Sequence, residues 1–173
     1  MNPIVSIIMG SDSDLQVMAK AAKMLEDFGV PYEMSVISAH RTADKMCEYA
    51  KGAKARGIKV IIAGAGWAAA LPSMVAAMTT LPVIGVPIYS KYFGGQDALY
   101  STVMTPPGVP VATVAIDGAA NAALLAIRML GIEDDGLTEK IAAYSDQMRE
   151  TVEKKAAKLE EVKYEAYLAD QKK

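Results

Sequence analysis

The sequence predicts an α/β fold in which helices cover both faces of a parallel β-sheet. Short apolar segments rich in β-branched residues alternate along the chain with longer segments of helical period. Glycines follow several of the helical segments, at the position where a helix commonly ends in a left-handed residue. Neither an internal repeat nor a linker-like stretch divides the 173 residues, so we expect one domain, 1–173. Regular alternation of this kind implies parallel strands joined by right-handed crossovers.

The first strand and the first helix have clear signals. Residues 3–9 form an apolar run, and residues 15–28 follow with one apolar face. That face consists of Val17, Ala21, Met24, Leu25 and Phe28. Gly29 stands where this helix should end. We interpret the N-terminal run as a strand rather than as a signal peptide, because no basic segment precedes it.

The same signals recur along the rest of the chain. Further strands are expected at residues 32–37, 60–63, 82–86 and 111–115. Further helices are expected at residues 43–56, 68–78 and 119–130, with Gly57 and Gly131 after the first and the last of them. The connection from 87 to 108 should hold a short helix near residues 97–103.

Residues 60–90 carry no charged side chain, and about 20 apolar residues can span a bilayer. Glycines and prolines divide this stretch into strand-length and helix-length pieces: Gly64, Gly66, Pro72, Pro82, Gly85 and Pro87. Buried parallel strands also produce continuous apolar runs, because both faces of their sheet are covered. We therefore interpret the stretch as core and subunit interface, and not as a membrane hairpin.

A helix of about thirty residues is expected at 137–169, after a core that spans residues 1–133. Its apolar stripe consists of Leu137, Ile141, Tyr144, Met148, Val152, Ala156, Leu159 and Val162. Lysine and glutamate dominate its other face. One small domain cannot bury so long a stripe, so we expect this helix to bind partner subunits. A partly frayed tail is the alternative.

Composition limits the classes of partner and compartment. The formal net charge is −2, so no global positive field favours nucleic acid or an anionic membrane. Any site for an anion must be local. Cys47 is the single cysteine, which excludes an internal disulfide and favours a reducing, cytoplasmic compartment.

Three predicted strand ends lead into segments that we name the first loop (residues 10–14, Gly-Ser-Asp-Ser-Asp), the second loop (38–42, Ser-Ala-His-Arg-Thr) and the third loop (64–70, Gly-Ala-Gly-Trp-Ala-Ala-Ala). Ligands of open parallel sheets bind at this edge, and helix N-termini there attract anions. Ser11 with Asp14 also resembles a capping box, which needs no ligand. The alternative role for Asp14 is to accept hydrogen bonds from a ribose diol.

The second loop carries the strongest chemical signal. His40 is the only histidine of the chain, and it precedes Arg41, whose guanidinium fork suits phosphate. An imidazole exchanges protons near neutral pH, which suits general acid–base catalysis. Although a lone histidine is more often structural, its place at a strand end beside Arg41 favours a catalytic role.

The third loop matches the dinucleotide pattern G-x-G-x-x-A at Gly64, Gly66 and Ala69, but no acidic residue follows about 20 positions later. Its small residues, Gly64, Ala65 and Gly66, still permit a ligand to approach the backbone closely. One histidine and one cysteine give no metal cluster of familiar spacing, and no G-x-S-x-G elbow supports a serine triad.

These motifs together resemble one family. The similar segments are the first two loops, Ala63-Gly64-Ala65-Gly66, Leu71-Pro72 and residues 107–113 (Pro-Gly-Val-Pro-Val-Ala-Thr). They resemble the 5-(carboxyamino)imidazole ribonucleotide mutases (PurE) of purine biosynthesis, and the similarity covers essentially the whole chain. The resemblance implies a flavodoxin-like three-layer sandwich assembled as a homo-octamer. It also implies transfer of a carboxylate from the exocyclic nitrogen of aminoimidazole ribonucleotide to C4, through carbon dioxide, without metal, nucleotide cofactor or biotin.

The resemblance also implies roles for individual residues. Ser11, Ser13 and Asp14 would bind the ribose and phosphate side of the substrate. Ser38 and Arg41 would hold phosphate, and His40 would be the general acid and base. The small residues of the third loop, Gly64, Ala65 and Gly66, would line the substrate pocket.

The third loop departs from the family's usual Gly-Gly-Ala-Ala-His-Leu-Pro-Gly pattern. Trp67, Ala70 and Ser73 replace a glycine, a histidine and a glycine, and the segment 89–93 (Tyr-Ser-Lys-Tyr-Phe) is also unusual. Three alternatives therefore stay open: a paralogue acting on another heterocyclic ribonucleotide, direct carboxylation of aminoimidazole ribonucleotide, and a non-enzymatic nucleotide-binding scaffold. The direct carboxylases typically carry lysine after the histidine, so Arg41 favours the mutase.

Overall fold

The computed structural model describes residues 2–171, so the ends of the expected 1–173 domain lie outside the described range. Within residues 2–171, five parallel strands form one sheet in the order β2-β1-β3-β4-β5. The strands are β1 (Val5–Met9), β2 (Tyr32–Val36), β3 (Val60–Gly66), β4 (Val83–Ile88) and β5 (Ala112–Thr113). This is the flavodoxin-like, doubly wound order, whose direction reverses beside β1. The predicted fold class is confirmed.

The three central strands are buried along almost their full length. β1 lies between β2 and β3, with Val5 in register with both Tyr32 and Val60. All of β1 and β4, and all of β3 except Gly66, are buried. The charge-free stretch from 60 to 90 therefore supplies two inner strands of the sheet, as a sheet covered on both faces requires.

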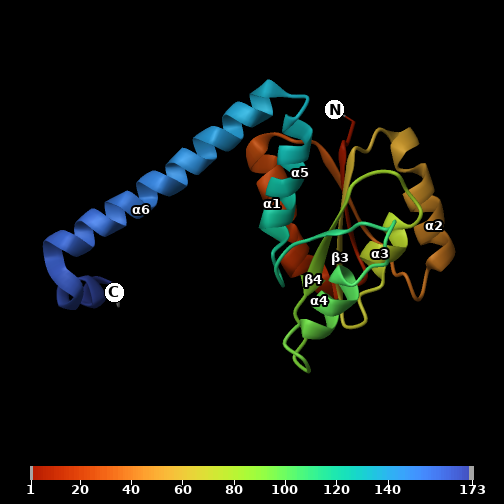
Figure 1. The fold of residues 1–173 in the computed structure, drawn as a ribbon, viewed down its shortest axis with the longest axis horizontal. Coiled ribbons are helices and arrows are strands. Elements are labelled where there is room, and N and C mark those ends of the chain that lie inside the picture. Colours follow the sequence, from red (N-terminus) through yellow and green to blue (C-terminus); the bar gives the residue numbers. More distant parts are fainter. Residues whose placement is uncertain (1, 172–173) are drawn as a thin grey trace.

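Helices cover the two faces of the sheet (Figure 1). α1 (Leu15–Phe28) and α5 (Ala119–Gly131) pack on one face, where they share a core with Ile7, Ile62 and Ile84. α2 (Ala43–Gly52), α3 (Leu71–Ala76) and α4 (Gln96–Val103) lie on the other face. The core on that side includes Ile8, Ile61 and Val83.

Three predicted elements are shorter by three residues or more in the structure. The helix expected at 68–78 spans only Leu71–Ala76, because Trp67 adopts a left-handed backbone conformation (φ 58°) and the next residues form a bend. The helix expected at 43–56 ends at Gly52, and a 3₁₀ turn, Lys54–Arg56, completes it. The strand expected at 111–115 is reduced to Ala112–Thr113.

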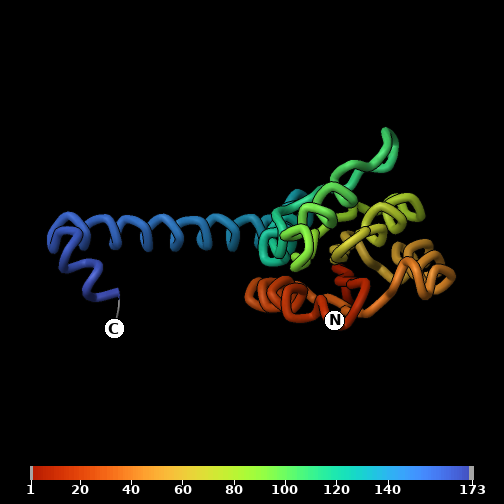
Figure 2. Tube along the Cα trace, turned by 90° about the horizontal axis from the view of Figure 1, so that it is seen from below, coloured from red at the N-terminus to blue at the C-terminus, as the bar shows by residue number. Residues whose placement is uncertain are grey.

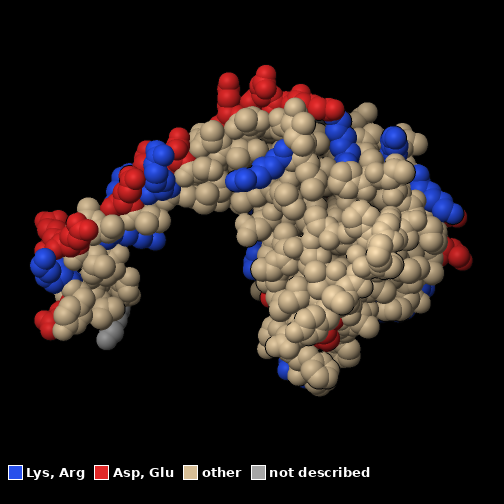
Figure 3. Space-filling model, in the orientation of Figure 1, with Lys and Arg blue, Asp and Glu red and all other residues tan. Residues whose placement is uncertain are grey.

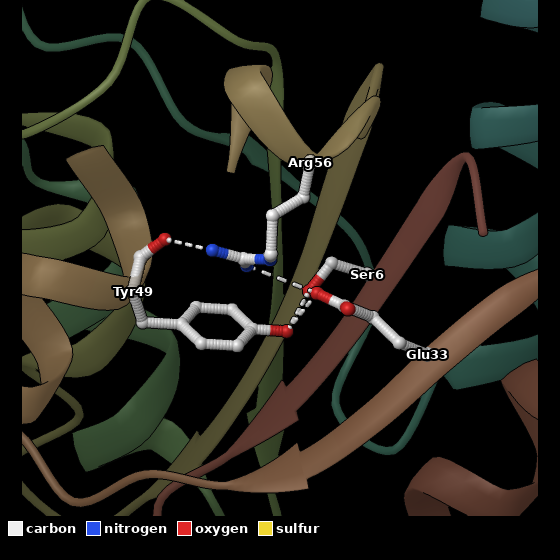
Figure 4. Close-up of polar contacts among 4 residues, drawn as sticks. All are labelled: Ser6, Glu33, Tyr49 and Arg56. Carbon is white, nitrogen blue, oxygen red and sulfur yellow. Dashed lines mark hydrogen bonds and ion pairs between the residues drawn. The ribbon is translucent and has the colours of Figure 1, made fainter. Parts of the chain in front are cut away.

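A polar cluster fixes α2 to the sheet (Figure 4). The hydroxyl of Tyr49, on α2, is hydrogen-bonded to the Ser6 hydroxyl of β1 at 2.7 Å and donates to the Glu33 carboxylate of β2. Arg56 donates to the same carboxylate at 3.1 Å and to the Tyr49 carbonyl at 3.3 Å. Burial and the Glu33 hydrogen bond raise the pKa of Tyr49 to about 12. The second loop leads directly into this anchored helix.

The C-terminal helix α6 (Asp135–Asp170) begins on the domain and projects away from it (Figures 1 and 2). Its first turns belong to the core, because Leu137 is buried and the Tyr144 ring meets that of Phe28 edge-on at 5.7 Å. Lys140 also donates to the Phe28 carbonyl at 2.8 Å. The core therefore extends past the expected boundary at 133.

The outer part of α6 leaves its apolar stripe uncovered: Met148, Val152 and Leu159 are exposed. Acidic and basic side chains alternate along the same projecting segment (Figure 3). The helix expected over 137–169 is present as α6, but it is kinked, since Lys163 has non-helical dihedrals (φ 63°, ψ 171°). The C-terminal end of α6 turns back (Figure 1). None of the helices between residues 2 and 171 combines the length and the apolar character that a bilayer crossing requires.

Candidate active site

The first, second and third loops meet in a pocket of about 560 Å³ at the carboxyl ends of β1, β2 and β3. It is lined by Gly10, Ser11, Ser13, Asp14, Ser38, Ala39, His40, Arg41, Ala65, Gly66, Trp67, Ala68, Ala70 and Leu71. All but one of the residues that the sequence suggested for the site are therefore neighbours. The position agrees with the general rule for ligands of doubly wound sheets.

The second loop is held by its own hydrogen bonds. Thr42 donates its backbone N–H and its hydroxyl to the Ser38 carbonyl, at 2.8 and 2.9 Å. The Ser38 hydroxyl accepts from the backbone N–H of Arg41 at 3.2 Å and from its Nε at 3.3 Å. Ser38 thus orients the guanidinium at the pocket.

Gly10 connects the three loops. Its carbonyl oxygen accepts from Nη2 of Arg41 at 3.4 Å, and its N–H donates to the Gly64 carbonyl at 3.1 Å. A side chain at Gly10 would face Asp14 and Ala65, each 3.9 Å away.

The first loop forms the short 3₁₀ turn Asp12–Asp14. The Ser11 hydroxyl accepts from the Ser13 N–H at 3.3 Å, so Ser11 caps this turn through residue 13 and not through residue 14. Asp14 is buried, and burial raises the pKa of its carboxyl group, although the Ser13 hydroxyl donates to it at 3.3 Å. A buried carboxylate with so few donors gains most from a ligand that supplies hydroxyl groups.

His40 is exposed at the pocket, between Ser38 and Arg41. Within residues 2–171 its imidazole is engaged in no hydrogen bond, so neither ring nitrogen is committed to a structural partner. A side chain in this situation can donate and accept a proton at a bound ligand.

The third loop contributes mostly small apolar groups. Ala65 and Gly66 line the pocket, whereas Gly64 lies behind its wall, where a side chain would collide with Met18 of α1. Gly64 is therefore explained by packing. Sequence reasoning assigned no role to the lining residues Ala39, Ala68 and Leu71, because alkyl side chains carry no chemical signal.

Trp67 is the one aromatic residue in the pocket wall. Trp67 adopts a left-handed backbone conformation, which for a residue with a Cβ is roughly 1–2 kcal/mol less favourable than the right-handed one. The indole is 63% exposed and meets the Tyr92 ring edge-on, with 5.4 Å between the ring centres. The departure of this loop from the resembled pattern was the sequence signal that pointed to it.

The pocket defines a class of protein: an α/β protein of flavodoxin-like fold whose strand ends bring serine, aspartate, histidine and arginine side chains together in one pocket. The sequence model of one family, described as AIR carboxylase, matches residues 4–151. The chain belongs to this family.

Curated relatives cover nearly the whole chain. N5-carboxyaminoimidazole ribonucleotide mutase of Pyrococcus horikoshii is 60% identical over 97% of this chain and 95% of its own length. The N5-carboxyaminoimidazole ribonucleotide mutase of Thermotoga maritima is 55% identical over 96% of this chain and 97% of its own length. Phosphoribosylaminoimidazole carboxylase of Saccharomyces cerevisiae is 58% identical over 96% of this chain, which spans only 29% of that protein.

Solved structures agree with the fold. Treponema denticola PurE has a TM-score of 0.84 and 32% identity, with 91% of this chain and 98% of that chain covered. T. denticola PurE2-S38D has a TM-score of 0.81 at the same identity, with 95% and 100% covered.

Proposed function

We propose that this chain is an N5-carboxyaminoimidazole ribonucleotide mutase of purine biosynthesis. One observation carries the proposal: His40 shares a single pocket with Arg41, Ser38 and Asp14, in a chain 60% identical over nearly its full length to a protein named for this activity. The enzyme is then an isomerase, since substrate and product differ only in the position of one carboxylate.

The pocket suits a phosphorylated ribose. The Arg41 guanidinium and the Ser38 hydroxyl bind the phosphate, and Ser11 and Ser13 of the first loop supply further hydroxyl groups. Asp14 accepts hydrogen bonds from the ribose, which replace donors that its buried carboxylate lacks. Ala65 and Gly66 let the substrate approach the end of β3 closely.

His40 moves one proton in each half of the reaction. It first protonates the exocyclic nitrogen as the bond between that nitrogen and the carboxylate carbon breaks, which releases carbon dioxide and aminoimidazole ribonucleotide. C4 then forms a bond to the same carbon dioxide, and His40 removes the C4 proton. The uncharged gas is held in the meantime at the third-loop end, where Ala65, Ala68 and Leu71 present apolar groups. No cofactor is needed for this sequence of steps.

Direct carboxylation is the second candidate, because the yeast relative of 58% identity is named a carboxylase. The test compares two incubations, one with the carboxyamino substrate and one with aminoimidazole ribonucleotide plus bicarbonate, with product absorbance followed in both. We expect rapid turnover of the carboxyamino substrate. Turnover of the carboxyamino substrate below ~0.1 per second, well under the usual enzyme range, would contradict the mutase proposal and favour a paralogue with another base.

The same proposal includes assembly and compartment. The exposed apolar residues of outer α6 need a partner surface, and a homo-octamer of identical chains supplies one. Cytoplasmic location follows from the metabolic role and from the single, unpaired Cys47.

A further inference from the structure

Trp67 stands at the third-loop end of the pocket in a position that its packing does not explain. The indole is 63% exposed, and its backbone lies in the left-handed region that favours glycine (φ 58°). A large, apolar, exposed side chain held in an unfavourable backbone conformation adds nothing to the core. Strain of this kind is commonly retained where a side chain contacts a ligand.

The segment after β4 holds the indole in place. Tyr92, in the segment after β4, meets Trp67 with an interplanar angle of 75° and 5.4 Å between ring centres. Lys91 places its ammonium group 5.2 Å from the centre of the Tyr92 ring, which adds a cation–π contact. An edge-to-face pair leaves at least one face of the indole uncovered by Tyr92.

The polarity of the pocket fixes what can lie against that face. The groups that bind anions and sugar hydroxyls belong to the first and second loops, at Ser11, Ser38 and Arg41. The third-loop end presents methyl groups and one aromatic ring. A ribonucleotide with its phosphate at Arg41 would therefore leave its heterocycle to the apolar third-loop end, which includes Trp67.

We propose that the heterocycle of the substrate stacks on the indole of Trp67, and that Tyr92 is a positioning residue that orients this indole. The proposal rests on the proposed function and names a specificity determinant of the same site: Trp67 selects a flat aromatic ring at the end opposite the phosphate. Because stacking tolerates different ring substituents, both the substrate and its C4-carboxylated product fit.

Fluorescence tests the contact directly, since Trp67 is the only tryptophan of the chain. The probes are the 4-carboxylated aminoimidazole ribonucleotide, ribose 5-phosphate and inorganic phosphate. We expect the ribonucleotide to change the tryptophan emission in a saturable way, with the same midpoint as its binding heat in calorimetry. Ribose 5-phosphate, which lacks the ring, should bind without changing the emission.

Four variants then separate stacking from a structural role. Trp67→Leu should raise KM about tenfold while kcat falls less than threefold, and Trp67→Phe should recover most of the affinity. Tyr92→Leu should raise KM and shift the emission, whereas Tyr92→Phe keeps the ring pair and should preserve both. Phe93→Leu is the matched control, because it removes the neighbouring, equally exposed ring.

The outcomes distinguish the two proposals. Binding of the ribonucleotide without any emission change, or an unaltered KM in Trp67→Leu, would overturn the stacking role and leave the mutase assignment intact. Wild-type protein that neither binds the ribonucleotide nor turns over the carboxyamino substrate would overturn the proposed function and, with it, this inference. A saturable change of the tryptophan emission in wild-type protein, with the same midpoint as the binding heat of the ribonucleotide, supports both the stacking role and the proposed function.

Discussion

Arg41 donates Nη2 to the carbonyl oxygen of Gly10 at 3.4 Å, which joins the second loop to the first across the pocket. The Ser38 hydroxyl restrains the same side chain from the other direction, through Nε at 3.3 Å. The guanidinium is thus oriented before any ligand arrives, and less side-chain entropy is lost on binding. A lysine would carry the charge but would make neither fork-like contact.

Arg41→Ala should weaken ribonucleotide binding by about 1.5–3 kcal/mol, the range for a hydrogen bond to a charged group. Arg41→Lys should lose part of this affinity, because it keeps the charge without the planar fork. Calorimetry with the ribonucleotide and with its unphosphorylated nucleoside provides the measurement. Equal losses for the two ligands would rule out a phosphate role.

His40→Asn should keep ribonucleotide affinity within about tenfold and lower kcat by ~10² or more, the usual scale of general acid–base catalysis. Asparagine retains polarity and approximate size but cannot exchange a proton near neutral pH. Steady-state kinetics with the carboxyamino substrate measure the effect. Wild-type turnover by this variant would show that another group moves the proton.

The sequence predicted the order of strands and helices well because each inner strand is buried on both faces and each long helix has one apolar face. It also predicted which loops converge, since parallel strands end at one edge of the sheet. Gly64 shows the limit of this reasoning. A glycine at a strand end is required either by an approaching ligand or by a neighbouring side chain, and only the structure identified Met18 as that neighbour.

Local backbone conformations and loop contacts that depend on the tertiary structure could not be predicted from the sequence. The helix after the third loop begins only at Leu71, because Trp67 takes a left-handed conformation that no propensity scale assigns to tryptophan. The pairing of Trp67 with Tyr92 joins loops 25 positions apart, which follow different strands. The break at Lys163 interrupts a pattern that looks helical throughout.

Asp14→Asn should raise stability at pH 7 while weakening ribonucleotide binding. Burial raises the pKa of Asp14, so its contribution to stability is complete below the ordinary value of 3.8 and is lost as pH rises through the higher folded value. The variant should therefore unfold at higher urea than wild type at pH 7. The difference should vanish below about pH 3.8. A variant less stable than wild type at pH 7 would show that the carboxylate is satisfied within the folded chain.

Tyr49→Phe should lower the free energy of unfolding by about 1–2 kcal/mol, because the Ser6 hydroxyl is fully buried and would lose its hydrogen-bond partner. Glu33 would keep its contact with Arg56 at 3.1 Å. Urea unfolding measures the change. Tyr32→Phe is the matched control: it removes an exposed hydrogen bond to Glu26 and should stay within about 0.5 kcal/mol of wild type.

Removal of outer α6 should lower the oligomeric state without unfolding the domain. Leu137 and Tyr144 belong to the core, so a chain cut after Gly136 would also lose core contacts, whereas a cut after Gln147 removes only the exposed stripe.

Val152→Glu places a charge in the same stripe, and Ala157→Glu adds the same charge on the opposite side of the helix. Light scattering should show smaller assemblies for the truncated chain and for Val152→Glu, and the wild-type mass for Ala157→Glu. Because a surface that is apolar in the monomer must be covered in the assembly, an unchanged number of subunits in both the truncated chain and Val152→Glu would show that outer α6 is not the contact.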